Sequence, residues 1–293
     1  MPTKDELPDF DALWDYNDPA ATERAFRELL PQAERAGDHS YHIELLTQIA
    51  RTQGLQHNFD AAHRTLDDAE RRLADSSGRP RIRYLLERGR VLNSSKHPDQ
   101  AQPLFLAAWE LGHAQQEDFY AVDAAHMLAI IAPPDQQLAW NRAALELAEQ
   151  SSDPRARKWL GSLYNNIGWT EHDAGQYQAA LETFQKALQC RLAQGSASEI
   201  RIARWCIARA LRSLNRPEEA LAIQRELLDE LVSSQATDGF VHEELGECLL
   251  ALGQPESAQP HFALAYAALA QDRWLAENEP ARLERLKTLG ATA

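Results

Sequence analysis

The sequence predicts an all-α protein built from stacked pairs of antiparallel helices, and three observations support this class. The segment Trp159–Leu188 places small and large apolar residues where two helices would interlock, with Gly168 and Ala180 at the close contact and Phe184 between the helices. The same pattern recurs along the chain about every 39 residues, as in a repeat architecture. Both ends depart from the pattern, as the terminal units of a stacked array do.

The start of the chain predicts a capping unit in residues 1–38. Pro19 stands at a favourable first helical position, and Asp18 before it is a good N-cap. Apolar and small residues then follow at helical spacing at Ala21, Ala25, Phe26 and Leu29. We expect this incomplete unit to cover the first complete helix pair.

Six helix pairs are expected to follow, each with Ala or Gly at the close contact of its first helix. The pairs lie at about 39–75, 79–115, 118–150, 159–195, 199–233 and 239–271. Their close-contact residues are Ala50, Gly89, Ala125, Gly168, Ala208 and Gly246. Most second helices carry a matching small residue, at Ala62, Ala101, Ala180, Ala220 and Ala258. Four residues after Ala220 the pattern has Gln224, a mismatch with the large apolar residue expected there.

The third pair has the weakest pattern. Residues 121–131 read as a helix, Pro133 and Pro134 end it, and residues 137–148 resume the helical pattern, which leaves the phase of this repeat open. In residues 272–293, leucines at positions 283, 286 and 289 predict a final capping helix. We therefore expect about 14 helices, and the lack of a Gly- or Ser-rich linker favours one elongated body.

The segment Trp159–Leu188 resembles a tetratricopeptide repeat (TPR). Repeats of about 39 rather than roughly 34 residues resemble the extended repeats of kinesin light chains. Tyr164-Asn165-Asn166 occupies the place where that family often has Leu-Asn-Asn. The resemblance implies a right-handed α-solenoid whose first helices line a concave groove, the surface on which relatives bind extended peptides. It is specific for fold and carries little information about the ligand.

Composition and charge exclude several classes of protein. The chain has 44 acidic and 30 basic residues and a formal net charge of −14, which repels nucleic acid and anionic membrane surfaces. It lacks an apolar run of about 18 residues that could span a membrane, and the start Met1–Glu6 lacks the apolar core of a secretory signal. The three cysteines, Cys190, Cys206 and Cys248, share no metal-ligand spacing. We expect a cytoplasmic protein.

Motifs for chemistry are missing from the sequence. It has no Gly-rich phosphate loop, His-Glu-x-x-His, Gly-x-Ser-x-Gly or Cys-x-x-Cys. His242, Glu243, Glu244 and Glu247 could gather around one helical turn, but acids near a helix start are common because they complement the helix dipole. We therefore expect no catalytic residue, no metal site and no cofactor.

Arginines concentrate on two of the expected first helices, in residues 79–90 and 201–212. Helical spacing of i, i+3, i+7 and i+10 selects the side chains that face away from the partner helix. This face also includes the acids Glu87, Asp123, Glu243, Glu244 and Glu247, together with His172. The candidate peptide-binding residues are Arg51, Arg83, Arg90, His126, Asn165, Asn166, Trp169, Trp205, Arg209 and Arg212.

Each candidate has a structural alternative. The arginines could bind carboxylates or phosphates through paired hydrogen bonds, or they could pair with acids of the chain itself, as Glu87 could with Arg83 or Arg90. Asn165 and Asn166 could bind a peptide backbone or bridge two repeats. Trp169 and Trp205 could form a shelf for a ligand or belong to the core. A lone histidine is usually a hydrogen-bonding residue, and the tryptophans at positions 14, 109, 140 and 274 are interpreted as packing residues.

Three functions compete. The first is a non-enzymatic interaction scaffold that binds an extended, acidic peptide or a partner's tail in the groove. The second is a regulatory sensor in which a small ligand or peptide alters the binding of a partner protein. An RNA-binding solenoid or an enzyme without a recognisable motif is the third. A groove of arginines within an acidic exterior would favour an acidic peptide, whereas a continuous basic stripe would favour nucleic acid. The oligomeric state, the partner and its pathway are left open.

Overall fold

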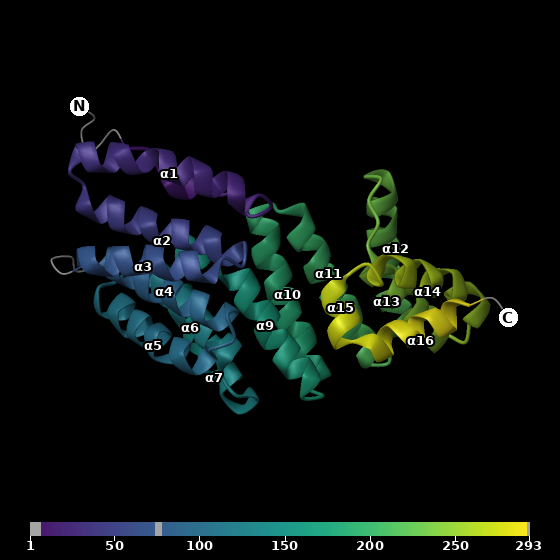
Figure 1. The fold of residues 1–293 in the computed structure, drawn as a ribbon. Coiled ribbons are helices and arrows are strands. Elements are labelled where there is room, and N and C mark those ends of the chain that lie inside the picture. Colours follow the sequence, from purple (N-terminus) through teal and green to yellow (C-terminus); the bar gives the residue numbers. More distant parts are fainter. Residues whose placement is uncertain (1–6, 74–77, 292–293) are drawn as a thin grey trace. The chain divides into compact units, whose positions relative to one another are not determined.

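The computed structural model describes residues 7–73 and 78–291, which form helices and connecting turns without a β-strand (Figure 1). The all-α prediction is thus confirmed, while the prediction for Met1–Glu6 lies outside the described residues. The chain divides into two compact units, Met1–Trp159 (unit 1) and Leu160–Ala293 (unit 2). We describe each unit by itself, and the single elongated body stays a prediction.

Unit 1 contains a leading helix and three antiparallel helix pairs. A 3-10 helix, η2 (Phe10–Leu13), precedes α1 (Pro19–Ala36). The pairs are α2 (His39–Leu55) with α3 (Phe59–Arg72), α4 (Arg79–Ser94) with α5 (Pro98–Ala114), and α6 (Asp118–Ile131) with α7 (Pro134–Gln150). A short helix, α8 (Pro154–Arg157), ends the unit.

Unit 2 contains three more pairs and the capping helix. The pairs are α9 (Leu160–Asp173) with α10 (Tyr177–Gln194), α11 (Ala197–Ser213) with α12 (Pro217–Ser233), and α13 (Gly239–Ala251) with α14 (Pro255–Leu269). They are followed by α15 (Arg273–Asn278) and α16 (Pro280–Gly290). The six pairs and the two capping helices are therefore confirmed within the described residues. The short helices α8 and α15 were not predicted from the sequence.

Three glycines, which have no side chain, allow the two helices of a pair to approach closely. A Cβ added to Gly168 would lie 2.5 Å from Cε1 of Phe184, far inside normal contact, so only glycine fits against this buried ring. The predicted helix phase is thus correct in this pair. The same contact, between a glycine of the first helix and a phenylalanine of the second, recurs at Gly89 with Phe105 and at Gly246 with Phe262.

The structure of the third pair shows why its sequence pattern is weak. Helix α6 begins at Asp118, where the third pair was expected to begin and three residues before its helical pattern, and buries Ala124 and Ala125 completely. The buried residues of helix α7 are Asn141 and two alanines, and its large apolar residue Trp140 is only partly buried. The Nδ2 of Asn141 donates a hydrogen bond to the carbonyl of Gln137 at 3.1 Å.

The ends of the helices follow the sequence signals. The carboxylate of Asp18 accepts a hydrogen bond from the backbone N–H of Ala21 at 2.8 Å, which caps α1 as predicted. Gly175 lies in the turn between α9 and α10 with a φ of 75°, a backbone conformation that favours glycine. Among the described residues, no helix has the length and apolar content to cross a membrane.

Most tryptophans interpreted as packing residues do pack. Trp109 and Trp140 lie edge to face, with ring centroids 6.1 Å apart, beside the core of unit 1. Trp274 contradicts the interpretation, because 61% of its surface is exposed. It lies on the short helix α15, where Leu275 is the buried residue.

Candidate binding faces on the first helices

The first helices of each unit present a face directed away from their partner helices. We call the side chains of α2, α4 and α6 at Arg51, Arg83, Glu87, Arg90 and Asp123 the unit-1 face. The corresponding side chains of α9, α11 and α13 form the unit-2 face and include Trp169, Trp205, Arg209, Arg212 and Glu244.

A ladder of alternating charges ties the three helices of the unit-1 face together. The Oε1 atom of Glu87, on α4, accepts hydrogen bonds from Arg51 of α2 at 3.2 Å and from Arg90 of its own helix at 2.6 Å. Arg90 also contacts both carboxylate oxygens of Asp123 on α6. Burial alone would lower the pKa of Arg90, but the charges of Asp123 and Glu87 outweigh it and raise that pKa. Arg90 is thus held charged.

Arg83 is buried in this face and receives a carboxylate from outside the helix pairs. Its two terminal nitrogens donate to the carboxylate oxygens of Asp11 at 2.6 and 2.8 Å, and one also donates to the hydroxyl of Tyr120 at 3.0 Å. Only 6% of the Arg83 side chain is exposed. Burial raises the pKa of the adjacent Glu44 carboxyl even though the charge of Arg83 opposes the shift.

A cavity of about 230 Å³ opens beside this ladder. Arg51, Arg83 and Arg155 supply its positive charge, and Asp11, Glu87 and Asp123 supply its negative charge. Its aromatic lining consists of Trp14, Tyr16, Phe119 and Tyr120. The guanidinium carbon of Arg155 lies 5.0 Å from the ring centroid of Phe119, a cation–π contact. The cavity can therefore hold a small group that combines charge with a flat or apolar surface.

His126 is half-buried and does not line this cavity. Its ring centroid lies 5.0 Å from that of Trp159, and burial lowers the pKa of its imidazole. The ring is consequently held neutral near pH 7. This environment agrees with a packing residue.

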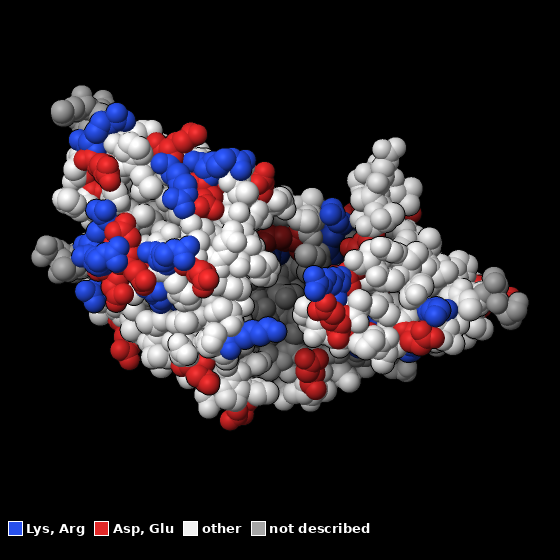
Figure 2. All heavy atoms as spheres, viewed as in Figure 1, with Lys and Arg blue, Asp and Glu red and all other residues white. Residues whose placement is uncertain are grey.

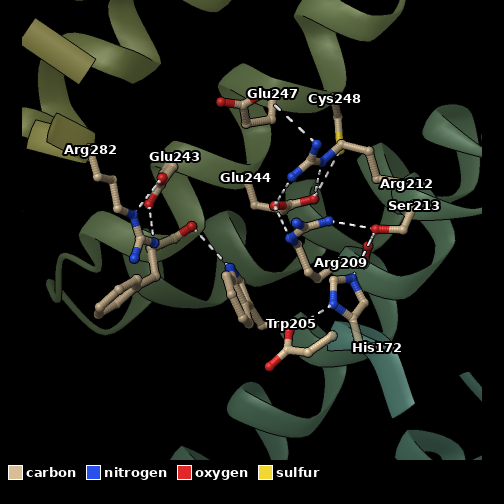
Figure 3. A network of polar contacts seen from close by, with 12 residues as sticks. His172, Trp205, Arg209, Arg212, Ser213, Glu243, Glu244, Glu247, Cys248 and Arg282 are labelled. Carbon is tan, nitrogen blue, oxygen red and sulfur yellow. Dashed lines mark hydrogen bonds and ion pairs between the residues drawn. The ribbon is translucent and has the colours of Figure 1, made fainter. Parts of the chain in front are cut away.

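The unit-2 face is centred on the buried carboxylate of Glu244 (Figure 3). Arg212 donates to its two oxygens at 2.5 and 3.0 Å, whereas the Nε of Arg209 lies 3.9 Å away. Arg209 instead donates to the hydroxyl of Ser213 at 2.6 Å, and this hydroxyl lies 2.9 Å from Nε2 of His172. Burial, followed by the charge of Arg212, lowers the pKa of Arg209. Arg209 is therefore the less neutralised arginine of the two.

Aromatic rings extend the unit-2 face from helix to helix. The ring centroid of Trp205 lies 5.9 Å from that of Trp169 and 6.2 Å from that of Phe240, and its indole N–H donates to the Phe240 carbonyl at 3.0 Å. Both tryptophans are half-buried and pack against the core of unit 2. Asn165 bridges two repeats, because its Oδ1 accepts from the thiol of Cys206 at 3.3 Å. Asn166 is half-buried on the same helix.

Other arginines of the two clusters point toward the second helices. Arg88 of α4 contacts Asp67 of α3, and Arg204 of α11 contacts Glu230 and, at 2.6 Å, Glu226 of α12. Arg204 thus links the two helices of one pair, whereas Arg88 links α4 to the second helix of the preceding pair. Their position makes them matched controls for the arginines of the faces.

The structure brings the predicted arginines onto the two faces but pairs them internally. The shortest carboxylate distances are 3.2 Å for Arg51, 2.6 Å for Arg83, 3.9 Å for Arg209 and 2.5 Å for Arg212, and Arg90 contacts Asp123. The internal ion pairs that the sequence left open are therefore present. The sequence analysis did not predict that the unit-1 cavity is also lined by Asp11, Tyr16, Phe119, Tyr120 and Arg155, and it interpreted Trp14 only as a packing residue.

The described residues hold no group of three or more His, Cys, Asp or Glu side chains that could bind a metal ion. His242 and His261 approach each other to 3.1 Å between their Nδ1 atoms. Burial raises the pKa of the thiols of Cys206 and Cys248 to about 12, which leaves them protonated and poorly nucleophilic at neutral pH.

Charges of both signs are mixed on the side of unit 1 that Figure 2 shows over α1 and α3. Asp68 of α3 pairs with Arg71 at 3.3 Å and with Arg72 at 3.4 Å, and Arg27 of α1 pairs with Glu23 at 2.7 Å. No continuous basic stripe of the kind that binds nucleic acid crosses the part of this side that the structure describes.

Comparison with known proteins shows which solved structures have a similar fold. A tetratricopeptide repeat family model matches residues 161–191, and no curated protein matches the sequence. The fold is similar to that of a signal transduction ATPase with a tetratricopeptide repeat sensor from Pyrococcus horikoshii, with a TM-score of 0.69 and 15% identity. That alignment covers 90% of this chain but only 41% of the other protein.

Two further structures match over most of both chains. A tetratricopeptide repeat protein from Parabacteroides merdae has a TM-score of 0.53 and 15% identity, and the alignment covers 96% of this chain and 95% of that one. NprR in complex with its cognate peptide NprX has a TM-score of 0.55 and 16% identity, with 95% and 81% covered. Identities this low establish the fold alone. The six helix pairs thus have the fold of tetratricopeptide repeat proteins, and residues 161–191 match the family model itself.

Proposed function

We propose that the chain is a non-enzymatic interaction scaffold that binds an extended, acidic peptide or partner tail on its first-helix faces. The supporting observation is the unit-1 cavity, because three successive first helices contribute polar and aromatic side chains to it. A surface shared by consecutive repeats suits an extended ligand, which can contact several repeats in turn. The net charge of −14 argues against nucleic acid and anionic membranes as partners, and we place the function in the cytoplasm.

Arg51 and Arg209 are the arginines best able to receive a ligand carboxylate. Their side chains are 27% and 28% exposed, compared with 6% for Arg83. Each is also incompletely neutralised, since Arg51 shares Glu87 with Arg90 and Arg209 lies 3.9 Å from Glu244. A carboxylate from a ligand would add the missing partner and form charge-assisted hydrogen bonds.

The neighbouring side chains suit the rest of a peptide. The amide of Asn166 both donates and accepts, so together with Asn165 it can bind a peptide backbone. The half-buried rings of Trp169 and Trp205 offer an apolar shelf for a side chain of the ligand. The unit-2 face thus combines a cation, an amide pair and an aromatic surface.

A regulatory sensor is the second candidate, and two similar structures favour it. One is described as a signal transduction ATPase with a tetratricopeptide repeat sensor, and another, NprR, is described as a quorum sensor and was solved with its cognate peptide. A sensor would change its affinity for a partner protein when a ligand binds, and the two affinities would be coupled reciprocally. A scaffold would show no such coupling.

The experiment combines affinity purification and mass spectrometry with two matched variants of helix α11. Arg209→Ala removes a cation from the unit-2 face, whereas Arg204→Ala removes one that contacts α12. A partner that is lost with Arg209→Ala and retained with Arg204→Ala would support the proposal. Its binding segment is then titrated by calorimetry, where loss of one charged hydrogen bond should cost ~1.5–3 kcal/mol.

Two controls make the result decisive. Circular dichroism must show that both variants stay folded, and binding should weaken with added salt because the contacts are partly exposed. If Arg51→Ala and Arg209→Ala both bind the partner segment with unchanged affinity, the arginines have no role in recognition. If the partner is found to bind the chain through another surface, the first-helix faces are not its binding site.

A further inference from the structure

The segment Leu7–Asn17, which we call the crossing segment, lies across the unit-1 face without belonging to a helix pair. Phe10, on its 3-10 helix, is only 5% exposed. The centroid of its ring lies 5.0 Å from that of Tyr41 and 6.1 Å from that of Phe26. It also lies 5.0 Å from the guanidinium carbon of Arg83. An aromatic side chain is therefore the first anchor.

Asp11 is the second anchor and contacts the buried Arg83 through both carboxylate oxygens, at 2.6 and 2.8 Å. This two-pronged geometry is how an arginine recognises the carboxylate of a ligand. Asp11 itself is 45% exposed, whereas the side chain of Arg83 is 6% exposed. Arg83 of the face is therefore a desolvated cation, whereas Asp11 of the crossing segment is an anion that remains partly exposed to solvent.

Trp14 is the third anchor. Its indole N–H donates to Oε1 of Gln48 on α2 at 3.0 Å, and its ring stacks on Tyr16 with centroids 4.7 Å apart. The guanidinium carbon of Arg51 lies 5.8 Å from the Trp14 ring and 5.6 Å from the Tyr16 ring. The second aromatic group therefore uses an arginine of the same face.

Between these anchors the crossing segment does not fill the surface. Trp14 and Tyr16 line the 230 Å³ cavity, and residues 7–10 line another cavity of about 580 Å³. Asp11, Arg83, Tyr120 and Arg155 line both. Phe10 belongs to a buried apolar cluster with Phe26, Leu29, Leu45 and Ile49, and Trp14 packs against it. The crossing segment is thus attached through its three anchors, while space beside Asp11 stays open.

We propose that the crossing segment is a built-in ligand of the unit-1 face. An external partner of this face is then a peptide with the same order of groups: an aromatic residue, an aspartate directly after it, and a second aromatic residue three positions later. This inference rests on the peptide binding proposed above and adds its recognition pattern. The partner must displace the crossing segment, whose tether keeps it at an effective concentration on the order of mM.

The test uses a fluorescein-labelled synthetic peptide of residues 7–17 and measures its fluorescence anisotropy. The peptide is titrated with the full chain and with the full chain carrying Phe10→Ala and Asp11→Asn, which weaken the competing segment. We expect the substituted chain to bind the peptide at least ~10-fold more tightly than the wild type. If Phe10→Ala impairs folding, Asp11→Asn alone keeps the same shape and should give a smaller gain in the same direction.

Matched variants identify the contacts. Adding Arg83→Lys to the substituted chain keeps the charge but removes the forked donor, so peptide binding should fall by ~10-fold. Arg88→Lys, on the same helix but facing Asp67 of α3, should leave it unchanged. A labelled peptide with asparagine in place of Asp11 should also bind ~10-fold more weakly.

Equal binding to the wild-type and substituted chains would show that the crossing segment does not compete and would overturn the inference. Absence of binding to a folded substituted chain would overturn it as well. The scaffold proposal is tested separately, by the comparison of Arg209→Ala and Arg204→Ala on the unit-2 face.

Discussion

Gly168→Ala tests the packing that defines the helix pairs. The new Cβ would lie 2.5 Å from Cε1 and 2.6 Å from Cδ1 of Phe184, whereas carbon atoms normally pack at about 3.5–4.0 Å. Because Phe184 is fully buried, its ring would have to move by about 1 Å in a closely packed core. Overpacking costs ~1–3 kcal/mol, and this displacement places the cost near the upper end.

Alanine recovers part of this cost because its helix propensity exceeds that of glycine by ~1 kcal/mol. The net loss of unfolding free energy should be about 2 kcal/mol, which corresponds to a Tm lower by about 4–8 °C. Differential scanning calorimetry measures the shift. Circular dichroism at room temperature should meanwhile show an unchanged helical content.

Gly161→Ala on the same helix is the matched control. Its Cβ would also lie 2.5 Å from a neighbour, but that neighbour is the end of the Arg191 side chain, which can swing away. We expect Tm to change by less than ~2 °C. Adding Phe184→Leu to Gly168→Ala should relieve the clash, with a coupling energy of ~1 kcal/mol or more in a double-mutant cycle. A Gly168→Ala protein that melts at or above the wild-type temperature would refute the assigned contact.

Three further predictions follow from buried polar groups. Gln224 is fully buried, and neither its Nε2 nor its Oε1 has a hydrogen-bond partner. The substitution Gln224→Met should therefore raise the free energy of unfolding by ~1–2 kcal/mol, as measured by urea titration. A loss of stability would contradict this reasoning. Burial raises the pKa of Glu244, so between pH 4.5 and that higher pKa the folded state binds more protons than the unfolded state. The stability of the wild type relative to Glu244→Gln should therefore be greatest below pH 4.5 and fall as the pH rises, which urea titrations across this range would reveal. Cys206 and Cys248, with thiol pKa values of about 12, should resist iodoacetamide at pH 8 until the chain is denatured, as mass spectrometry would show.

The sequence predicted the helix pairs because a short-range rule links each small residue to the large one it contacts. Gly168 and Phe184 belong to neighbouring helices, so the chain's own periodicity reveals their contact. The third pair was harder to place because α7 has Asn141 and alanines in its buried positions, where the pattern demands a large apolar residue.

The faces were predictable only in part. Helical spacing placed Arg51, Arg90 and Asp123 on one side of their helices, but it gave no distances, so it could not choose between ligand binding and internal pairs. Asp11 escaped prediction for a different reason. It lies 72 positions before Arg83 and outside every repeat, and no periodic pattern connects the two residues.

The glycine contacts also reveal a longer period in the chain. Gly89, Gly168 and Gly246 belong to the second, fourth and sixth pairs, and each meets a phenylalanine. The first, third and fifth pairs have alanine at the corresponding place of the first helix, at Ala50, Ala125 and Ala208. Their second helices bury a leucine, an asparagine and a glutamine: Leu66, Asn141 and Gln224. The residue at the close contact therefore repeats every two pairs, with an alanine-type pair followed by a glycine-type pair. A duplication or deletion of two successive pairs would keep this alternation, whereas the loss of one pair would bring two pairs of the same type together in the sequence.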